Sequence, residues 1–405
     1  MPDAVMSGGA RVVSSATLAH IGDGIRQVAL PLLVVSMTRH PIAVSGLTAV
    51  SFLPWVLLGL PIGAYVDQGR PLAVAVGANL GRAVLLGLLA VTLLAGFRSI
   101  ALVYVVVFGL GVGEAAYDNA AQSLLPLVVS DAGLEKANGW LVTVEQVGQD
   151  LAGPAVGGLI FAASAALPFG LNAVGLLLGV ALLAPTRTAA RPVAARGVHV
   201  RQLLSQIPEG MRWLLRNRRV RVIIFAGTGL TFLVQLWQPL LVLLALGPMR
   251  VSPTGYGVML ALGSIAGIGG ALATPMLIRR FSQRSLQVFA LAATAAGVLA
   301  LATFPNPVVA ALTWGDTGFT FALWNVLSVT LRQRLVPPEL LGRVNSASRT
   351  FSTAAVPLGA LAGGAVANAA GLRAPFWLSA IALAFLSLIF AGQTARRRAE
   401  PQPAD

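Results

Sequence analysis

The sequence predicts an all-α protein that crosses a membrane many times, and three observations support this fold class. Of the 405 residues, 56% are hydrophobic and 10% are charged, whereas a soluble domain carries roughly 25% charged residues. The mean hydropathy is +0.81. Apolar runs long enough to cross a bilayer, which takes about 20 residues, recur along the whole chain. The polar residues are too few to cover a soluble surface, whereas lipid needs no polar coat.

Short connections rich in helix breakers separate these runs and leave about twelve predicted transmembrane helices. Pro41, Pro71 and the pair Pro337-Pro338 stand in three of the connections. The predicted spans lie near residues 12–37, 42–66, 72–95, 100–124, 139–165, 167–184, 221–246, 254–278, 285–305, 307–331, 344–369 and 374–394.

The formal net charge of +14 is distributed as a topology signal. If the N-terminus is cytoplasmic, most arginines, including those between residues 185 and 221, fall on the same side. The positive-inside rule then predicts a multi-pass protein of the inner (plasma) membrane with both termini in the cytoplasm. A high charge is also typical of nucleic-acid-binding proteins, but its distribution over alternate loops argues against that partner. The opposite face holds only Arg39, Arg98, Arg250 and Arg373.

The chain contains an internal repeat. The segment Gln27–Val34 recurs as Gln235–Val242 at an offset of 208, and Leu134–Asn138 recurs as Leu341–Asn345 at an offset of 207. Two unrelated markers with nearly the same shift indicate a duplication. Two six-helix halves related by an axis along the membrane normal are the plan of the major facilitator fold. We therefore expect an N-terminal bundle (1–184), a basic cytoplasmic linker with an amphipathic helix (185–220), a C-terminal bundle (221–394) and a cytoplasmic tail (395–405).

Acidic residues inside the predicted helices concentrate in the first half. An ionised carboxylate in a membrane core costs about 2.5–3.5 kcal/mol even on the mild insertion scale. The second-half equivalents of Asp23, Arg26, Glu114, Asp118 and Glu145 carry no charge, so the fold does not require these charges. The residues expected to couple protons or contact substrate are Asp23, Arg26, Arg82, Glu114, Asp118, Glu145, Asp150 and Asp316.

Asp23 is the leading proton-coupling candidate, because it lies near the membrane midplane and shares a helix face with Arg26. Glu114 and Asp118 lie four residues apart, and two carboxylates that close do not readily both ionise in a low dielectric. The alternative is a static ion pair of Asp23 with Arg26, or of an acid with Arg82. A lone acid such as Asp316 can equally face water.

Polar and aromatic residues of helices 1, 4, 7 and 10 are candidates for the wall of a central cavity, although packing explains the aromatic residues equally well. His20, one turn before Asp23, is either a proton relay or a packed polar residue. The absence of cysteines, of metal-ligand spacing and of a Walker loop predicts no metal, cofactor or ATPase site. The cavity candidates are His20, Gln27, Tyr117, Gln235, Trp237, Trp324 and Asn325.

Two short motifs resemble signatures of the major facilitator superfamily. Gly153-Pro154-Ala-Val-Gly157-Gly158 resembles the fifth-helix antiporter motif of drug:proton exporters, and ordinary small-residue packing is the alternative explanation of its glycines. The loop with Gly63, Asp67 and Arg70 resembles the signature loop whose Asp caps the eleventh helix and latches one conformation, and Arg349 lies near the start of that helix. Here one residue is missing and Gln68 replaces a basic residue, so a simple turn is the alternative.

Together with Gly22-Asp23-Gly24 and the segment ending at Asn138, these motifs make the whole chain similar to one branch of the superfamily. This drug:proton antiporter branch contains Tap-type multidrug efflux pumps, macrolide efflux proteins and the enterobactin exporter. The resemblance implies a monomeric transporter in the bilayer, not an enzyme, that exports a small amphipathic molecule (drug, antibiotic or siderophore) in exchange for protons by alternating access.

The runner-up interpretation is a proton-coupled nutrient importer on the same fold, against which the fifth-helix motif weighs. A membrane enzyme or sensor is a different class. No nucleophile–base set, metal site or sizeable soluble domain in the sequence supports it.

Overall fold

The structure is a computed structural model that describes residues 2–66, 70–186 and 211–398. All regular secondary structure in these ranges is helical. The first-half helices are α1 (Pro2–Met37), α2 (Pro41–Val66), α3 (Pro71–Leu94), α4 (Ile100–Val128), α5 (Asp131–Glu145), η1 (Gln146–Ala152), α6 (Gly153–Ala163) and α7 (Leu167–Leu183). The second-half helices are α9 (Arg218–Trp237), η2 (Gln238–Leu240), α10 (Leu241–Leu246), α11 (Pro253–Arg280), α12 (Gln283–Thr303), α13 (Pro307–Leu335), α14 (Pro338–Ala370) and α15 (Ala374–Arg398).

The predicted all-α membrane fold is confirmed. Nine helical segments of the described chain are long and apolar enough to cross a membrane. The three other predicted spans coincide with α7, with α13 and with the interrupted run α5–η1–α6. Twelve spans are therefore consistent with the structure. Most of the predicted linker, including residues 187–210, lies outside the described residues, while 211–216 are helical.

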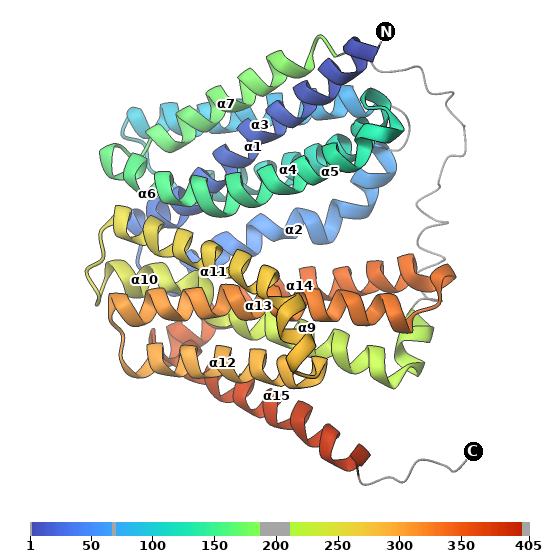
Figure 1. Ribbon diagram of the computed structural model, residues 1–405. Helices are drawn as coiled ribbons and strands as arrows, with labels where there is room; N and C mark the ends of the chain where they lie inside the picture. The colour runs from blue at the N-terminus through green and yellow to red at the C-terminus, as the bar shows by residue number, and fades with distance from the viewer. Residues whose placement is uncertain (1, 67–69, 187–210, 399–405) are drawn as a thin grey trace. The chain divides into compact units, whose positions relative to one another are not determined.

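The chain separates into two compact units. One comprises α1 to α7 together with the stretch Ser252–Ala261, which contains the start of α11. The other comprises α9, η2, α10, the rest of α11, and α12 to α15. Within the first unit, α1 runs through the middle of the bundle and packs against α4, α5, η1, α6 and α7 (Figure 1). Its side chains can therefore meet partners from several helices at once.

The fifth predicted span is not one continuous α-helix. Between α5 and α6 the chain forms a π-helix over Gln146–Ala152. The N–H of Gly153 donates to the carbonyl of Gly148, five residues back. Pro154 follows directly, and a proline has no N–H and displaces the carbonyl four residues before it, here that of Asp150. The proline thus explains why regular α-helical bonding fails just before it, at the level of Asp23.

Glycines allow α1 to approach this interrupted helix. A Cβ added to Gly24 would lie 2.5 Å from the carbonyl oxygen of Gln149 and 2.9 Å from the Cα of Gly153. A Cβ added to Gly153 would lie 2.5 Å from the Cα of Gly24. Because backbone atoms are at the contact, no side-chain movement can make room. Small residues at crossings are the usual means of close helix packing in membranes.

We predict that Gly24→Ala destabilises the protein by about 1–3 kcal/mol, the range for overpacking. Gly81→Ala is the matched control, because Gly81 is also inside a helix but a Cβ there would meet nothing within 4 Å. The control should be neutral or stabilising by roughly 0.5–1 kcal/mol, since alanine favours the helix. Thermal unfolding of both variants in detergent measures the difference, and equal unfolding temperatures would contradict the proposed contact.

Candidate functional site

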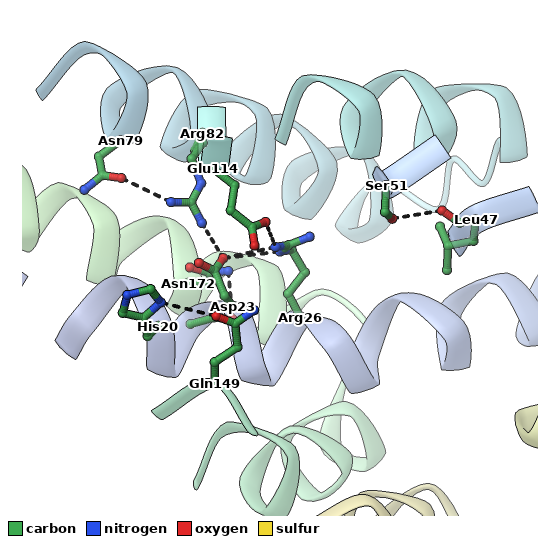
Figure 2. Close-up of polar contacts among 11 residues, drawn as sticks. His20, Asp23, Arg26, Leu47, Ser51, Asn79, Arg82, Glu114, Gln149 and Asn172 are labelled. Atoms are coloured by element: carbon green, nitrogen blue, oxygen red, sulfur yellow. Dashed lines mark hydrogen bonds and ion pairs between the residues drawn. The ribbon is translucent and has the colours of Figure 1, made fainter. Parts of the chain in front are cut away.

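A buried network of charged side chains is centred on Asp23 in the middle of α1 (Figure 2). Asp23 is 2% exposed. Its Oδ1 accepts hydrogen bonds from Arg26 through Nη2 at 3.2 Å and Nε at 3.4 Å. The same oxygen accepts a hydrogen bond from Nη2 of Arg82, which extends from α3. One carboxylate oxygen therefore holds two guanidinium groups together.

The network continues to α4 through Arg26. Nη2 of Arg26 donates to Oε2 of Glu114 at 2.6 Å, so this guanidinium bridges two carboxylates. With all four groups ionised, two positive and two negative charges balance. A buried charge is tolerated when it is paired and hydrogen-bonded, and the network meets this condition by joining α1, α3 and α4. The side chain of Glu114 is 18% exposed, which makes it the most accessible member of the pairs.

Arg82 is held in place from two sides. It is 1% exposed, and its Nη1 donates to Oδ1 of Asn79, one turn earlier on α3, at 3.2 Å. On the other side, Gly113 of α4 leaves space for its stem, because a Cβ at Gly113 would lie 2.5 Å from Cγ of Arg82. The amide of Asn79 and the space beside Gly113 thus orient the Arg82 guanidinium toward Asp23.

The backbone of α1 beside Asp23 is fixed by α7. Asn172 of α7 donates through Nδ2 to the carbonyl of Gly22 at 2.9 Å. A Cβ at Gly22 would lie 2.1 Å from Oδ1 of Asn172, so a larger residue here would displace the Asn172 side chain. The Gly22-Asp23-Gly24 motif therefore has a steric explanation. Gly22 allows close contact with α7, and Gly24 allows close contact with the fifth span. Asp23 lies between these two contacts in the sequence.

His20 lies one turn before Asp23 and contacts the π-helix. Its Nδ1 is 3.2 Å from Oε1 of Gln149, a residue of η1 (Figure 2). The side chain is buried, at 7% exposure. A neutral imidazole with its proton on Nδ1, or an imidazolium, would donate this bond. The contact places a titratable side chain between the π-helix and the charged network.

Asp118 lies one turn beyond Glu114 on α4 and is partly buried. Among the described residues, none forms a hydrogen bond or an ion pair with its carboxylate. Its neighbour Tyr117 is almost completely buried, and the hydroxyl groups of Tyr117 and Ser15 are 3.3 Å apart. Asp118 is therefore a carboxyl group beside a charge-balanced network, without a counter-ion of its own in the described part of the chain.

The remaining predicted acids lie outside this network. Glu145 ends α5 and Asp150 lies in η1, and both are exposed. Asp316 lies on α13 in the second unit, where its Oδ2 is buried with no hydrogen-bond partner in the described chain. Of the eight residues predicted to couple protons or contact substrate, the structure brings four into direct contact. These are Asp23, Arg26, Arg82 and Glu114.

The residues predicted to line a cavity have mixed surroundings. Gln27 and Asn325 are exposed, and Gln235 donates to Gln238 at 3.0 Å. Trp237 is completely buried, with ring centroids 6.2 Å from Trp314 and 5.7 Å from Phe376. Trp324 packs against Phe390, with ring centroids 5.8 Å apart. Both tryptophans thus pack in the interior of the second unit.

The four glycine and proline residues of the fifth-span motif are buried helix contacts. Gly153 and Gly157 meet the backbone of α1 at Gly24 and Ile25. Gly158 meets the first turn of α11, which belongs to the same compact unit, and a Cβ there would lie 2.3 Å from the carbonyl oxygen of Pro253. Pro154 opens α6. The motif therefore sets the distances of α6 from α1 and from the first turn of α11.

The predicted cytoplasmic latch falls partly outside the described residues, because Asp67 does. Gly63 lies in the last turn of α2, Arg70 directly precedes α3, and Arg349 is an exposed residue of α14. The latch stays a prediction. Among the residues that the structure describes, no group of three or more His, Asp or Glu side chains is arranged to hold a metal ion.

Sequence reasoning missed the two asparagines that orient the network. Asn79 lies three residues before Arg82, and the helix-face spacing that connected Asp23 with Arg26 would have found it. Asn172 is a polar residue inside the apolar run 167–184, which is itself a signal in a membrane helix. The contact of Asn172 with Gly22 required the fold.

A bundle of apolar helices with a balanced set of charges at its centre defines a polytopic membrane transporter, because such charges mark ion or substrate pathways. The sequence model of the Major Facilitator Superfamily matches residues 12–359, and the chain belongs to this superfamily. Its members are transporters rather than enzymes.

Similar proteins include efflux pumps. The multidrug efflux pump Tap of Mycolicibacterium fortuitum is 26% identical over 395 residues, which cover 93% of each chain. Macrolide efflux protein A of Streptococcus pyogenes is 23% identical and covers 91% of each chain. Among solved structures, a bacterial homologue of the iron transporter ferroportin in an inward-facing state has a TM-score of 0.72 at 19% identity and covers 96% of this chain and 98% of that chain. The nucleoside transporter NupG has a TM-score of 0.76 at 12% identity, over 96% and 99% of the two chains.

We predict that Asp23→Asn and Arg82→Gln each destabilise the protein by about 3–5 kcal/mol, because each breaks the buried ion pair and leaves the network with one uncompensated charge. The double variant Asp23→Asn/Arg82→Gln should cost less than the sum, with a coupling energy of about 0.5–3 kcal/mol. Unfolding of the four proteins in detergent provides this double-mutant cycle. Strictly additive effects would show that the two side chains do not interact.

Proposed function

We propose that the protein exports a small amphipathic molecule, such as a drug, an antibiotic or a siderophore, in exchange for protons. The observation that carries this proposal is the buried network Asp23–Arg26–Arg82–Glu114 in the first unit. Its equivalents in the second half are uncharged. The similarity to Tap and to macrolide efflux protein A over more than 90% of the chain supports export of this class of solute.

Protonation of Asp23 would change the contacts between helices. Its Oδ1 attracts both Arg26 and Arg82, and a neutral carboxyl group would lose both ionic attractions. Arg26 would then keep Glu114, whereas Arg82 would keep the amide oxygen of Asn79. A single proton would therefore weaken the connection of α1 to α3 while that of α1 to α4 remains. This is a direct way to couple proton binding to helix movement.

Asp118 supplies a further charge next to the four-residue network, whose own charges sum to zero. When it is ionised, the cluster has one negative charge in excess, and a low-dielectric surrounding favours its compensation. Either a proton or the cationic group of a substrate can compensate it. Competition between the two for one carboxyl group is the simplest basis for exchange, since each would displace the other. We propose that Asp118 takes part in this competition through the cationic group of the substrate, while Asp23 remains the leading carboxyl group for the coupled proton.

The remaining features of the proposal follow the sequence pattern. The predicted two-bundle division with a basic linker, the cytoplasmic position of both termini and a monomeric working unit agree with the positive-inside rule and with the family plan. The fifth-span glycines, which keep α6 close to α1, are proposed to restrict the movement of the bundle during exchange.

We expect Asp23→Asn to lose transport driven by a pH gradient while it retains substrate counterflow. In proteoliposomes, efflux of a labelled macrolide or of ethidium would no longer respond to an imposed pH gradient, because the leading titratable carboxyl is gone. Counterflow between equal proton concentrations would continue, since it needs substrate binding and helix movement but no net proton movement. Loss of both activities would instead indicate a purely structural role.

Glu339→Gln is the control for this experiment. Glu339 is an exposed acid in the first turn of α14, so its neutralisation changes the charge equally but far from the network in sequence. Its efflux should respond to the gradient as the wild type does. An unaltered gradient response in Asp23→Asn would remove Asp23 from the proposed role.

Direction is tested in cells. We expect overexpression to lower the accumulation of a macrolide or of ethidium, and deletion to raise it, because an exporter works against inward diffusion. An uncoupler should abolish the difference. Higher accumulation on overexpression would instead support the importer, which uses the same fold.

A further inference from the structure

A pocket of about 250 Å³ lies within the second unit, where α9 and α12 begin. It is separate from the charged network of the first unit, and the proposed export does not use it. Five of its lining residues carry hydrogen-bond donors, and the others include an apolar wall with Ile223, Leu331 and Phe390. The donor-bearing residues are Arg218, Arg219, Gln283, Arg284 and Gln287.

Two amide groups in this pocket have no acceptor in the described chain. Gln287 is 2% exposed, and its Nε2 forms no hydrogen bond with any described residue. The same is true of Nε2 of Gln283. Buried donors are almost always satisfied in folded proteins, and an exception requires an explanation. A ligand with acceptor oxygens in the pocket would satisfy both.

Arginines make the pocket positive. Arg284 is held in a fixed orientation, because its Nη2 donates to the carbonyl of Phe390 at 3.0 Å and its guanidinium lies 5.6 Å from the centre of the Phe390 ring. Arg218 and Arg219 are exposed. None of the described lining residues is acidic. Guanidinium groups favour an anion, and their planar donor pattern suits phosphate oxygens.

Two helix N-termini add to this preference. Arg218 is the first residue of α9, which has 20 residues, and Gln283 is the first residue of α12, which has 21. Both residues line the pocket. The N-terminal end of a helix carries a partial positive charge and is a common binding site for phosphate.

We propose that this pocket binds a phosphate group at the membrane surface. The donors would surround the phosphate oxygens, and the apolar wall of Ile223, Leu331 and Phe390 suits the acyl chains of an anionic phospholipid. Free inorganic phosphate shares the headgroup chemistry and lacks the apolar part. The experiment therefore compares an anionic phospholipid with free inorganic phosphate.

The test is native mass spectrometry of the full-length protein, titrated with phosphatidylglycerol or with zwitterionic phosphatidylcholine. We expect one phosphatidylglycerol to bind more tightly than phosphatidylcholine. Arg284→Gln should weaken this binding about tenfold, the effect of one lost charge-assisted hydrogen bond. The double variant Arg218→Gln/Arg219→Gln changes only exposed side chains, which keeps the fold intact, and should also weaken it. Inorganic phosphate is tested in parallel by the shift that it causes in the thermal unfolding of the lipid-free protein.

Arg280→Gln is the matched control, because Arg280 is an exposed arginine in the last turn of α11 and does not line the pocket. It should bind phosphatidylglycerol like the wild type. Stabilisation by inorganic phosphate that is lost in Arg284→Gln would support the site with free phosphate as its source. The proposal is overturned if neither phosphate source binds, if both lipids bind alike, or if Arg280→Gln weakens binding as much as Arg284→Gln.

Discussion

The first unit depends on the contact of Asp23 with Arg82. Neither charge is stable alone at 1–2% exposure in an apolar bundle, so each requires the other. Arg26 and Glu114 extend the contact to a third helix while keeping the sum of charges at zero. Two glycines make room around this contact, since Gly113 faces the stem of Arg82 and Gly22 faces the amide of Asn172 beside Asp23.

The two halves of the duplicated chain treat the same position differently. At the site of Asp23, the second half has Thr231, whose hydroxyl group donates to the carbonyl of Gly227 in its own helix at 3.1 Å. At the site of Arg26 it has Val234, which is buried. At these two positions the second unit thus has a hydroxyl group bonded within its own helix and an apolar side chain, and aromatic rings such as Trp237 fill part of its interior. The buried ion pairs that join α1, α3 and α4 lie in the first unit, which is why it is the better candidate for chemistry.

Much of the fold could be predicted from the sequence, because the apolar runs, their proline-containing connections and the repeat are one-dimensional signals. The pairing of Asp23 with Arg26 also follows from spacing within one helix. The contacts of Arg26 with Glu114 and of Asp23 with Arg82 do not, since they depend on which faces of α1, α3 and α4 meet. A proline at position 154 is enough to expect a bend in the fifth span, but not a π-helix that begins at Gln146. A single sequence does not distinguish a cavity wall from packing as the surroundings of Trp237 and Trp324.

The π-helix of the fifth span makes the two ends of that span differ in rotational phase. A π-turn accommodates about one residue more than an α-turn, and one residue corresponds to about 100° of rotation around a helix axis. Rewinding Gln146–Ala152 as an α-helix would therefore turn the face of α5 that carries Glu145 by about that angle relative to α6. Gly153 and Gly157 anchor α6 against α1, so the turning would fall on the α5 side. The π-helix is thus the point at which α5 would rotate relative to α6, while the glycines keep α6 in contact with α1.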